Sequence, residues 1–201
     1  MIYLVCSART CSEDDSTAAT REEENTVDLK DSVRHFFMTD TLFDRSLRGF
    51  EIAATEKLID FADYMKIISD TTLDLKFRQH AAKLVRDLFI SHEIKLNNWS
   101  RAYSDTGLYT LEFLLAHSLK EGLSCWICPL QINVSEPFAT ADDSTFTGGL
   151  SFNLQCVSLD SQDTSDIISE SLFMDIYLIK HLKPFGKDEF RVWSVYLGDV
   201  N

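Results

Sequence analysis

The sequence predicts an α+β domain, in which two to three helices pack on a curved, four-stranded antiparallel sheet. Two observations favour this class. Apolar residues repeat with a helical period through the middle of the chain, and after Gly122 they alternate with a period of two. Near the C-terminus, the runs 172–182 and 190–200 flank a turn that contains Pro184 and Gly186, which predicts a hairpin. Because helices come first and strands follow, we expect the helices to lie on one face of the sheet.

The clearest helix is predicted over residues 47–68. Its apolar positions are three or four residues apart and form one face: Phe50, Ala54, Leu58, Phe61, Met65 and Ile68. Asp74 is a plausible N-cap for a second helix. The buried positions expected in that second helix are Phe77, Ala81, Leu84 and Leu88. Residues 108–119 suit a helix or a strand, and the stop at Gly122 favours a helix.

The strands are predicted from alternation. The run 126–134 contains Pro129 near its start. A proline there predicts that the strand is an edge strand or has a bulge. Residues 145–156 alternate most regularly, with apolar side chains on one face and polar ones on the other. Both faces of the closing hairpin are apolar. It therefore needs cover on both sides, and we expect helices on one side and a homodimer through the sheet as one way to cover the other.

Composition excludes some classes of function. The chain has 201 residues and a net charge of −13, which argues against nucleic-acid binding and favours basic or neutral partners. No apolar run is long enough to cross a bilayer. Residues 1–31 are acidic and poor in large apolar side chains, so we expect a disordered leader there and a single domain over residues 32–201. The five cysteines do not predict a disulfide framework.

An acidic run, Ser12-Glu13-Asp14-Asp15, directly follows Cys11. This stretch resembles the start of some Gram-negative surface lipoproteins, in which a lipidated cysteine is followed by acidic residues. The resemblance implies lipid attachment at Cys11 and a location at the cell envelope, provided that the true start lies upstream. The residues before Cys11 do not form a good lipobox, and the alternatives are a plain acidic leader and a cytoplasmic protein.

The order of elements over residues 47–200 resembles the nuclear transport factor and ketosteroid isomerase superfamily, a cone of curved sheet around helices. The segment most similar to the superfamily is the aromatic-rich final strand, 190–199. A cystatin-like sheet on a helix is the alternative fold. A cone would place a ligand pocket among six side chains: Phe61, Met65, Trp126, Phe152, Tyr177 and Trp193. The family's base is an acid at the mouth of the cone, and Asp60, Asp63 and Asp175 are the residues considered, although no motif transfers the catalytic role to any of them.

The pattern Cys125-Trp126-Ile127-Cys128 is a CxxC motif, which in redox proteins opens a helix. Here it lies in a predicted strand, so we expect two structural thiols rather than a redox or metal site. No metal or other cofactor is expected. Two functions therefore stand: a non-catalytic binding module whose partner is a protein or a small apolar ligand, and, as the alternative, an isomerase or dehydratase that uses an acid in an apolar cone.

Overall fold

A computed structural model describes residues 42–97, 110–122, 125–158, 165–186 and 188–201, with backbone alone at 125–127, 156–158, 165–170, 185 and 188. Residues 41–201 form one compact unit. Its elements are the helices α2 (Asp44–Ser69), α3 (Leu75–Leu88) and α4 (Leu111–Glu121) and the strands β1 (Cys125–Asp142), β2 (Thr145–Ser158), β3 (Ser165–Phe185) and β4 (Asp188–Val200). The predicted α+β class is confirmed, and the predicted leader lies outside the described residues.

The helix boundaries follow local signals in the sequence. Asp74 caps α3 by accepting a hydrogen bond from the backbone N–H of Lys76 (2.8 Å), as predicted. Thr110 caps α4 by accepting from the backbone N–H of Phe113 (3.3 Å). α4 ends at Gly122, whose φ of +73° favours glycine. Residues 111–121 are thus helical, and the ambiguity over that segment is settled. In the described part of the chain, none of the helices has both the length and the hydropathy that a membrane span needs.

The buried face of α3 differs from the prediction. Phe77 was expected in the core, but it is 52% exposed, whereas Arg78 is only 6% exposed. The helix is rotated so that Arg78, Ala81, Ala82, Val85 and Leu88 face inward. The physical reason is that the buried guanidinium finds backbone carbonyl groups on two other helices, which apolar patterning cannot show.

Arg78 joins the C-terminal ends of α2 and α4. Its Nε donates to the carbonyl of Ile68 (2.7 Å), and its Nη2 donates to the carbonyls of Ser118 (2.9 Å) and Leu119 (3.0 Å). The last carbonyls of a helix have no partner within the helix and carry partial negative charge, so a cation there is favourable. One side chain of α3 therefore holds all three helices together.

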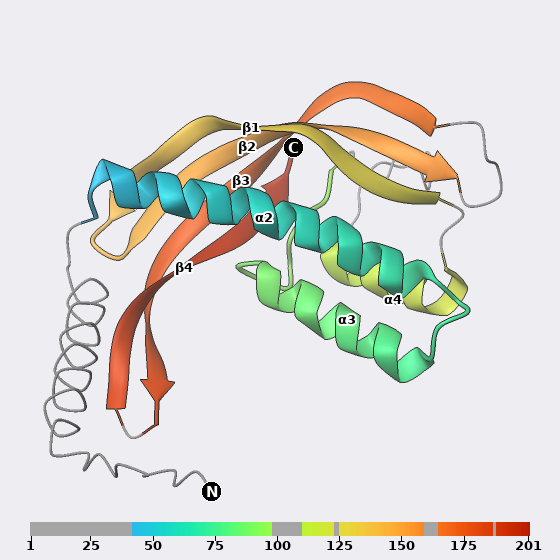
Figure 1. Cartoon of the computed structure of the whole chain (residues 1–201), viewed down its shortest axis with the longest axis horizontal. Helices are drawn as coiled ribbons and strands as arrows, with labels where there is room; N and C mark the ends of the chain where they lie inside the picture. The colour runs from blue at the N-terminus through green and yellow to red at the C-terminus, as the bar shows by residue number, and fades with distance from the viewer. Residues whose placement is uncertain (1–41, 98–109, 123–124, 159–164, 187) are drawn as a thin grey trace, which may run out of the picture. The chain divides into compact units, whose positions relative to one another are not determined.

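The sheet is an antiparallel meander in the order β1-β2-β3-β4 (Figure 1). β1 is an edge strand, and its register with β2 shifts between Leu130 and Asn133, where Gln131 adopts a φ of +53°. The prediction that Pro129 marks an edge or a bulge is therefore confirmed. Proline and bulges protect an edge strand from pairing with other chains.

The predicted hairpin forms from β3 and β4. Its pairs run from Met174↔Val200 to Phe185↔Asp188, whereas the pairing of β2 with β3 ends at Thr145↔Ile179. The tip of the hairpin therefore extends past the β1–β2 turn and projects away from α2 (Figure 1). On the other side of β4, the chain after α3 runs alongside the last residues: the N–H of Ile90 donates to the carbonyl of Leu197 (2.9 Å).

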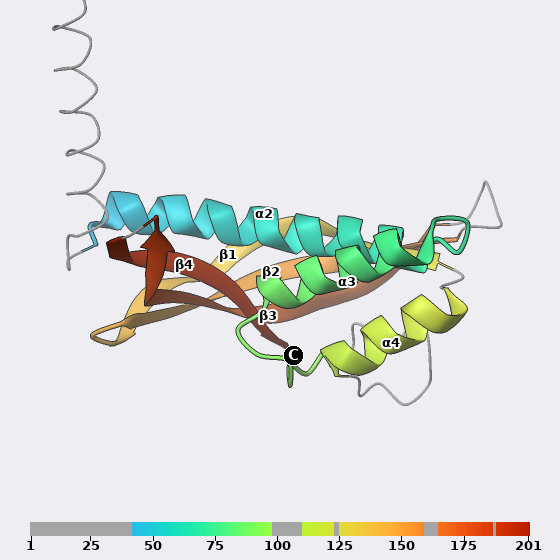
Figure 2. The same cartoon turned by 90° about the horizontal axis from the view of Figure 1, so that it is seen from below.

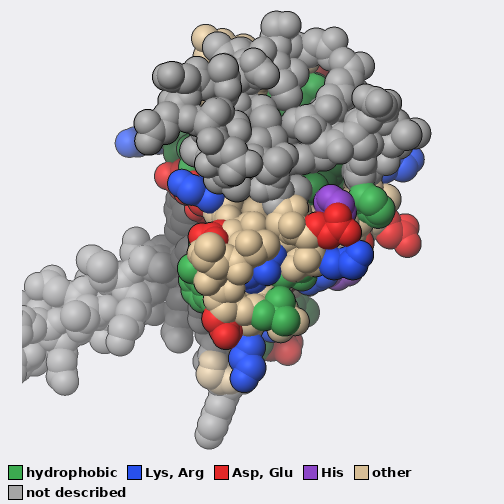
Figure 3. Space-filling model, turned by 90° about the vertical axis from the view of Figure 1, so that its right-hand side faces the viewer, with side chains coloured by type: hydrophobic (Ala, Val, Ile, Leu, Met, Phe, Trp, Pro, Cys, Tyr) green, Lys and Arg blue, Asp and Glu red, His purple; other side chains and the backbone are tan. Residues whose placement is uncertain are grey.

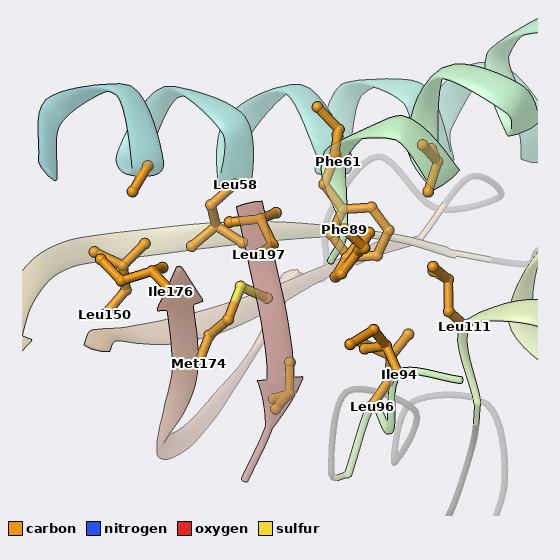
Figure 4. Close-up of a cluster of buried hydrophobic side chains, with 14 of the residues drawn as sticks. Leu58, Phe61, Phe89, Ile94, Leu96, Leu111, Leu150, Met174, Ile176 and Leu197 are labelled. Carbon is orange, nitrogen blue, oxygen red and sulfur yellow. The ribbon is translucent and has the colours of Figure 1, made fainter. Parts of the chain in front are cut away.

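The three helices lie on one side of the curved sheet (Figure 2). We call the face of the sheet that they cover the inner face. Its side chains meet those of the helices in a single core, which Figure 4 shows. Residues that are completely buried in it include Leu58, Phe61, Leu150, Met174, Ile176 and Leu197. The ring of Phe61 meets that of Phe89 edge to face, with centroids 5.1 Å apart.

Candidate interaction site

The face of the sheet opposite the helices, which we call the outer face, is covered less completely. β3 alternates strictly: Met174, Ile176 and Leu178 are completely buried on the inner face, and the residues between them point outward. The outer-face side chains of β3 and β4 are half-buried, apart from the buried Val192 and the exposed Lys183: Phe173, Asp175, Tyr177, Ile179, His181, Lys183, Phe190, Val192, Ser194 and Tyr196. The outer face thus combines aromatic, aliphatic and charged side chains.

Two glycines let aromatic rings lie flat on this face. A Cβ added to Gly149 would lie 2.1 Å from the ring of Phe173, and one added to Gly198 would lie 2.5 Å from the ring of Tyr177. Each ring therefore occupies the space where a neighbouring side chain would otherwise stand. Asp175 lies between the two aromatic residues along β3, so its carboxylate is flanked by two rings.

Three carboxylates come together across the strands at this level. Gly149 of β2 pairs with Glu136 of β1 on one side and with Asp175 of β3 on the other. The register of β3 with β4 shifts between Met174 and Ile176, which sets Gly198 and Asp199 opposite Asp175. We call Glu136, Asp175 and Asp199 the acidic row.

The pKa values within the row reflect this arrangement. Burial raises the pKa of Asp175, and the negative charges of Asp199 and Glu136 raise it further. Burial also raises the pKa of the Tyr177 hydroxyl, with further contributions from Asp175 and Asp199. The fold therefore keeps like charges near one another on a partly desolvated surface, which costs free energy unless something else offsets the charge.

Within the described part of the chain, no lysine, arginine or histidine forms an ion pair with a member of the row. Asp199 accepts one hydrogen bond, from the backbone N–H of Lys95 (2.8 Å). The helices differ: Arg86 of α3 donates to both carboxylate oxygens of Glu112 in α4, at 2.6 and 2.8 Å. At the end of the molecule where α2 leads into α3, acidic and basic side chains lie beside each other (Figure 3). Among the described residues, Glu112 of the helices thus has an arginine partner, whereas the carboxylates of the acidic row have no cationic one.

Farther along β3, the same face becomes basic. His181 and Lys183 follow Ile179 at alternate positions, near the projecting tip of the hairpin. The Nδ1 atom of His181 is buried and has no hydrogen-bond partner among the described residues. Its ring is tilted against that of Tyr196, with centroids 6.3 Å apart. One strand thus presents an acid, two apolar side chains, an imidazole and an ammonium group in sequence.

The structure brings together only some of the six predicted pocket residues. Phe61, Met65 and Phe152 are core residues, exposed by 0%, 6% and 1%. Trp193 also lies on the inner face, near the hairpin, where its ring meets Phe146 edge to face at 5.4 Å. Tyr177 lies on the outer face. The side chain of Trp126 and the proposed lipid site, Cys11, lie outside the described residues.

The acids considered for catalysis are also separated. Asp60 and Asp63 are exposed on α2, and Asp175 is on the outer face. The CxxC segment is in strand β1, as predicted, and burial raises the pKa of the Cys128 thiol, so it is less reactive than a free cysteine. Among the described residues, no group of three or more His, Cys, Asp or Glu is placed to hold a metal ion. Sequence reasoning missed Glu136 and Asp199, which meet Asp175 only through bulges.

Comparison with known proteins found no matching family model and no curated relative. The resemblance to the nuclear transport factor and ketosteroid isomerase superfamily therefore stays a prediction, as does the lipoprotein origin.

Proposed function

We propose that this chain is a non-catalytic interaction module that binds a partner protein through the outer face of its sheet. The observation that carries the proposal is the acidic row, set between the rings of Phe173 and Tyr177 without a cationic partner among the described residues. Carboxylates together with aromatic faces bind lysine and arginine side chains well, through ion pairs and cation–π contacts. The partner surface is therefore expected to be basic and partly apolar, in keeping with the chain's net charge of −13.

The experiment that tests this proposal is a titration of isotope-labelled protein with hexalysine, followed by NMR. We expect the largest amide shift changes around Gly149, Asp175 and Gly198. In the triple variant Glu136→Gln/Asp175→Asn/Asp199→Asn, affinity is expected to fall about tenfold or more, because three charges facing the peptide are lost.

A matched control removes the same charge elsewhere. The variant Glu56→Gln/Asp60→Asn/Asp63→Asn neutralises three exposed carboxylates of α2. It is expected to weaken hexalysine binding less than threefold, because only the long-range field changes. Equal losses in the two triple variants would mean that hexalysine senses net charge alone, and the outer face would have no special role.

The alternative function is that of an isomerase or dehydratase. It has one observation in its favour, the raised pKa of Asp175 beside Tyr177, since a general base works best with a pKa near the working pH. However, the buried polar side chains of the described inner core are Ser69, Arg78 and Ser118, without a carboxylate. Deuterium exchange at carbon atoms next to the carbonyl of simple ketones tests it. Exchange that depends on protein and is lost in Asp175→Asn would favour the enzyme.

A further inference from the structure

We propose that the partner of the outer face is a second copy of this chain, packed face to face about a two-fold axis that passes near Ile179 and runs across the strands. This inference rests on the function proposed above and names the partner. It follows from the pattern of outward side chains along β3. At alternate positions they are Asp175, Tyr177, Ile179, His181 and Lys183, an order that is self-complementary about its centre.

The positions of the charged side chains along β3 determine the direction of the two-fold axis. An axis across the strands reverses β3 of the second copy, so Asp175 lies opposite Lys183 of that copy and Tyr177 lies opposite its His181. Ile179 then meets its own counterpart. An axis along the strands would instead place Asp175 on Asp175 and Lys183 on Lys183, which like charges disfavour. Closed two-fold pairing of one patch with itself is the commonest way in which proteins form dimers.

The neighbouring strand fits the same axis. Ser194 of β4 pairs with Ile179 and so lies level with the axis. Tyr196, one step to one side, then meets Val192 of the second copy, one step to the other side. Ser194 and Tyr196, which are half-buried in the single chain, thus add to the contact that β3 makes, as in the packing of two sheets at about 10 Å.

The shape of the hairpin supports this arrangement. Its tip continues past the last β2–β3 pair, Thr145↔Ile179, so among the described residues β4 is the only strand that pairs with this part of β3. In the dimer, this projecting part lies over the acidic row of the second copy, and Lys183 approaches the three carboxylates.

Charge reversal tests the pairing. The mass of the full 201-residue chain is measured by light scattering after gel filtration at about 50 μM, and the wild type is expected to give twice the 23.0 kDa of one chain. Asp175→Lys and Lys183→Asp each place like charges opposite each other, so each is expected to give a monomer. The double variant restores opposite charges with the signs exchanged, so it is expected to recover the dimer.

The control for these charge changes is Asp60→Lys, on the exposed side of α2, which is expected to remain a dimer. Circular dichroism checks that each variant is folded. If either single reversal fails to fold, Ile179→Asp provides a second test, because it places two carboxylates on the axis and is expected to give a monomer. A monomeric wild type would overturn the inference, since the outer face would then be open or covered by another segment of the same chain. Failure of the double variant to recover the dimer would also overturn it.

Hexalysine binding tests the proposed function separately from the dimer. Lys183→Asp leaves the acidic row intact but uncovered, so hexalysine is expected to bind this variant at least threefold more tightly than the wild type. If the wild type is a monomer that binds hexalysine through the row, the dimer is wrong and the interaction module stands. A third outcome is that neither the wild type nor Lys183→Asp binds hexalysine through the row, while the double variant Asp175→Lys/Lys183→Asp forms the dimer. The row would then serve self-association alone.

Discussion

The two faces of one sheet differ in what covers them, although β3 carries large apolar side chains on both. On the inner face, Met174, Ile176 and Leu178 are completely buried beneath three helices. On the outer face, Asp175, Tyr177 and Ile179 are half-buried, and the acid among them has a raised pKa. Alternation assigns each residue to a face, but only the packing of the helices decides which face becomes the core. The other face keeps apolar surface that a partner can cover.

The largest expected difference between the faces comes from two isoleucines on the same strand. Ile176→Ala on the inner face is expected to lower the free energy of unfolding by about 4 kcal/mol, through lost burial and a cavity. Ile179→Ala on the outer face is expected to lower it by about 1 kcal/mol, because the site is partly open to solvent. Both are measured by urea titration in the Lys183→Asp background, where the proposed dimer is absent. Equal losses would mean that the outer face is as closely packed as the core.

The second prediction concerns Arg78, the side chain that joins the three helices over the inner face. Arg78→Met keeps the length of the side chain but leaves the carbonyls of Ile68, Ser118 and Leu119 without their donor. We expect the free energy of unfolding to fall by about 3 kcal/mol, the range for hydrogen bonds to a buried charged group. The exposed Lys83 of the same helix provides the control, and Lys83→Met is expected to change stability by less than about 0.5 kcal/mol. A similar effect of the two substitutions would show that α3 is held by its apolar residues alone.

Much of the fold could be predicted because its signals are local. Asp74 and Gly122 mark helix ends by backbone chemistry, and the closing hairpin is evident from alternation and its turn. The face of α3 could not be predicted, because apolar patterning assigns a buried arginine such as Arg78 to the surface. Its place depends on carbonyls that are up to 41 residues away in sequence.

The candidate site was harder to predict than the fold. Asp175 was considered from sequence as an acid on the sheet, and the hairpin's need for cover on both faces was apparent. Glu136 and Asp199 reach it only because β1 and β4 contain irregular registers, and Gly149 and Gly198 make room for the rings beside it. Tyr177 was assigned to an internal pocket, because alternation alone does not say which side of the sheet the helices occupy.

The third prediction compares two adjacent glycines that serve the two faces. A Cβ on Gly148 would lie 2.7 Å from the carbonyl oxygen of Glu136, so the backbone of β1 must move. Gly148→Ala is expected to cost about 2 kcal/mol. A Cβ on Gly149 meets only the far end of the Phe173 ring, which can rotate outward, so Gly149→Ala is expected to cost about 1 kcal/mol. Thermal unfolding of both variants in the Lys183→Asp background gives the ranking, and the reverse order would mean that the Phe173 ring is fixed in place.

The smallest expected effects concern two carboxylates whose pKa values shift in opposite directions. Burial and neighbouring acids raise the pKa of Asp175, so its charged form is less favourable in the fold than in the unfolded chain. The resulting penalty is present at pH 7 and disappears as the pH falls through the folded pKa. In the Lys183→Asp background, Asp175→Asn is therefore expected to raise the free energy of unfolding at pH 7 by about 0.5 kcal/mol. The gain should shrink as the pH approaches 4.

The pKa of Glu112 shifts in the opposite direction, so the effect of its charge on stability has the opposite sign. Hydrogen bonds from Arg86 lower its pKa, so its contribution to stability is present above its unfolded pKa and is lost as the pH falls through the folded one. Glu112→Gln is expected to lower the free energy of unfolding at pH 7 by about 0.5 kcal/mol, because the pair is partly exposed, and the loss should fade towards pH 3. Urea titrations of both variants across this range compare a carboxylate paired within the chain with one that is not. If Asp175→Asn were destabilising at pH 7 in a monomer, its charge would already be offset by a group of the same chain, and the outer face would not need a basic partner.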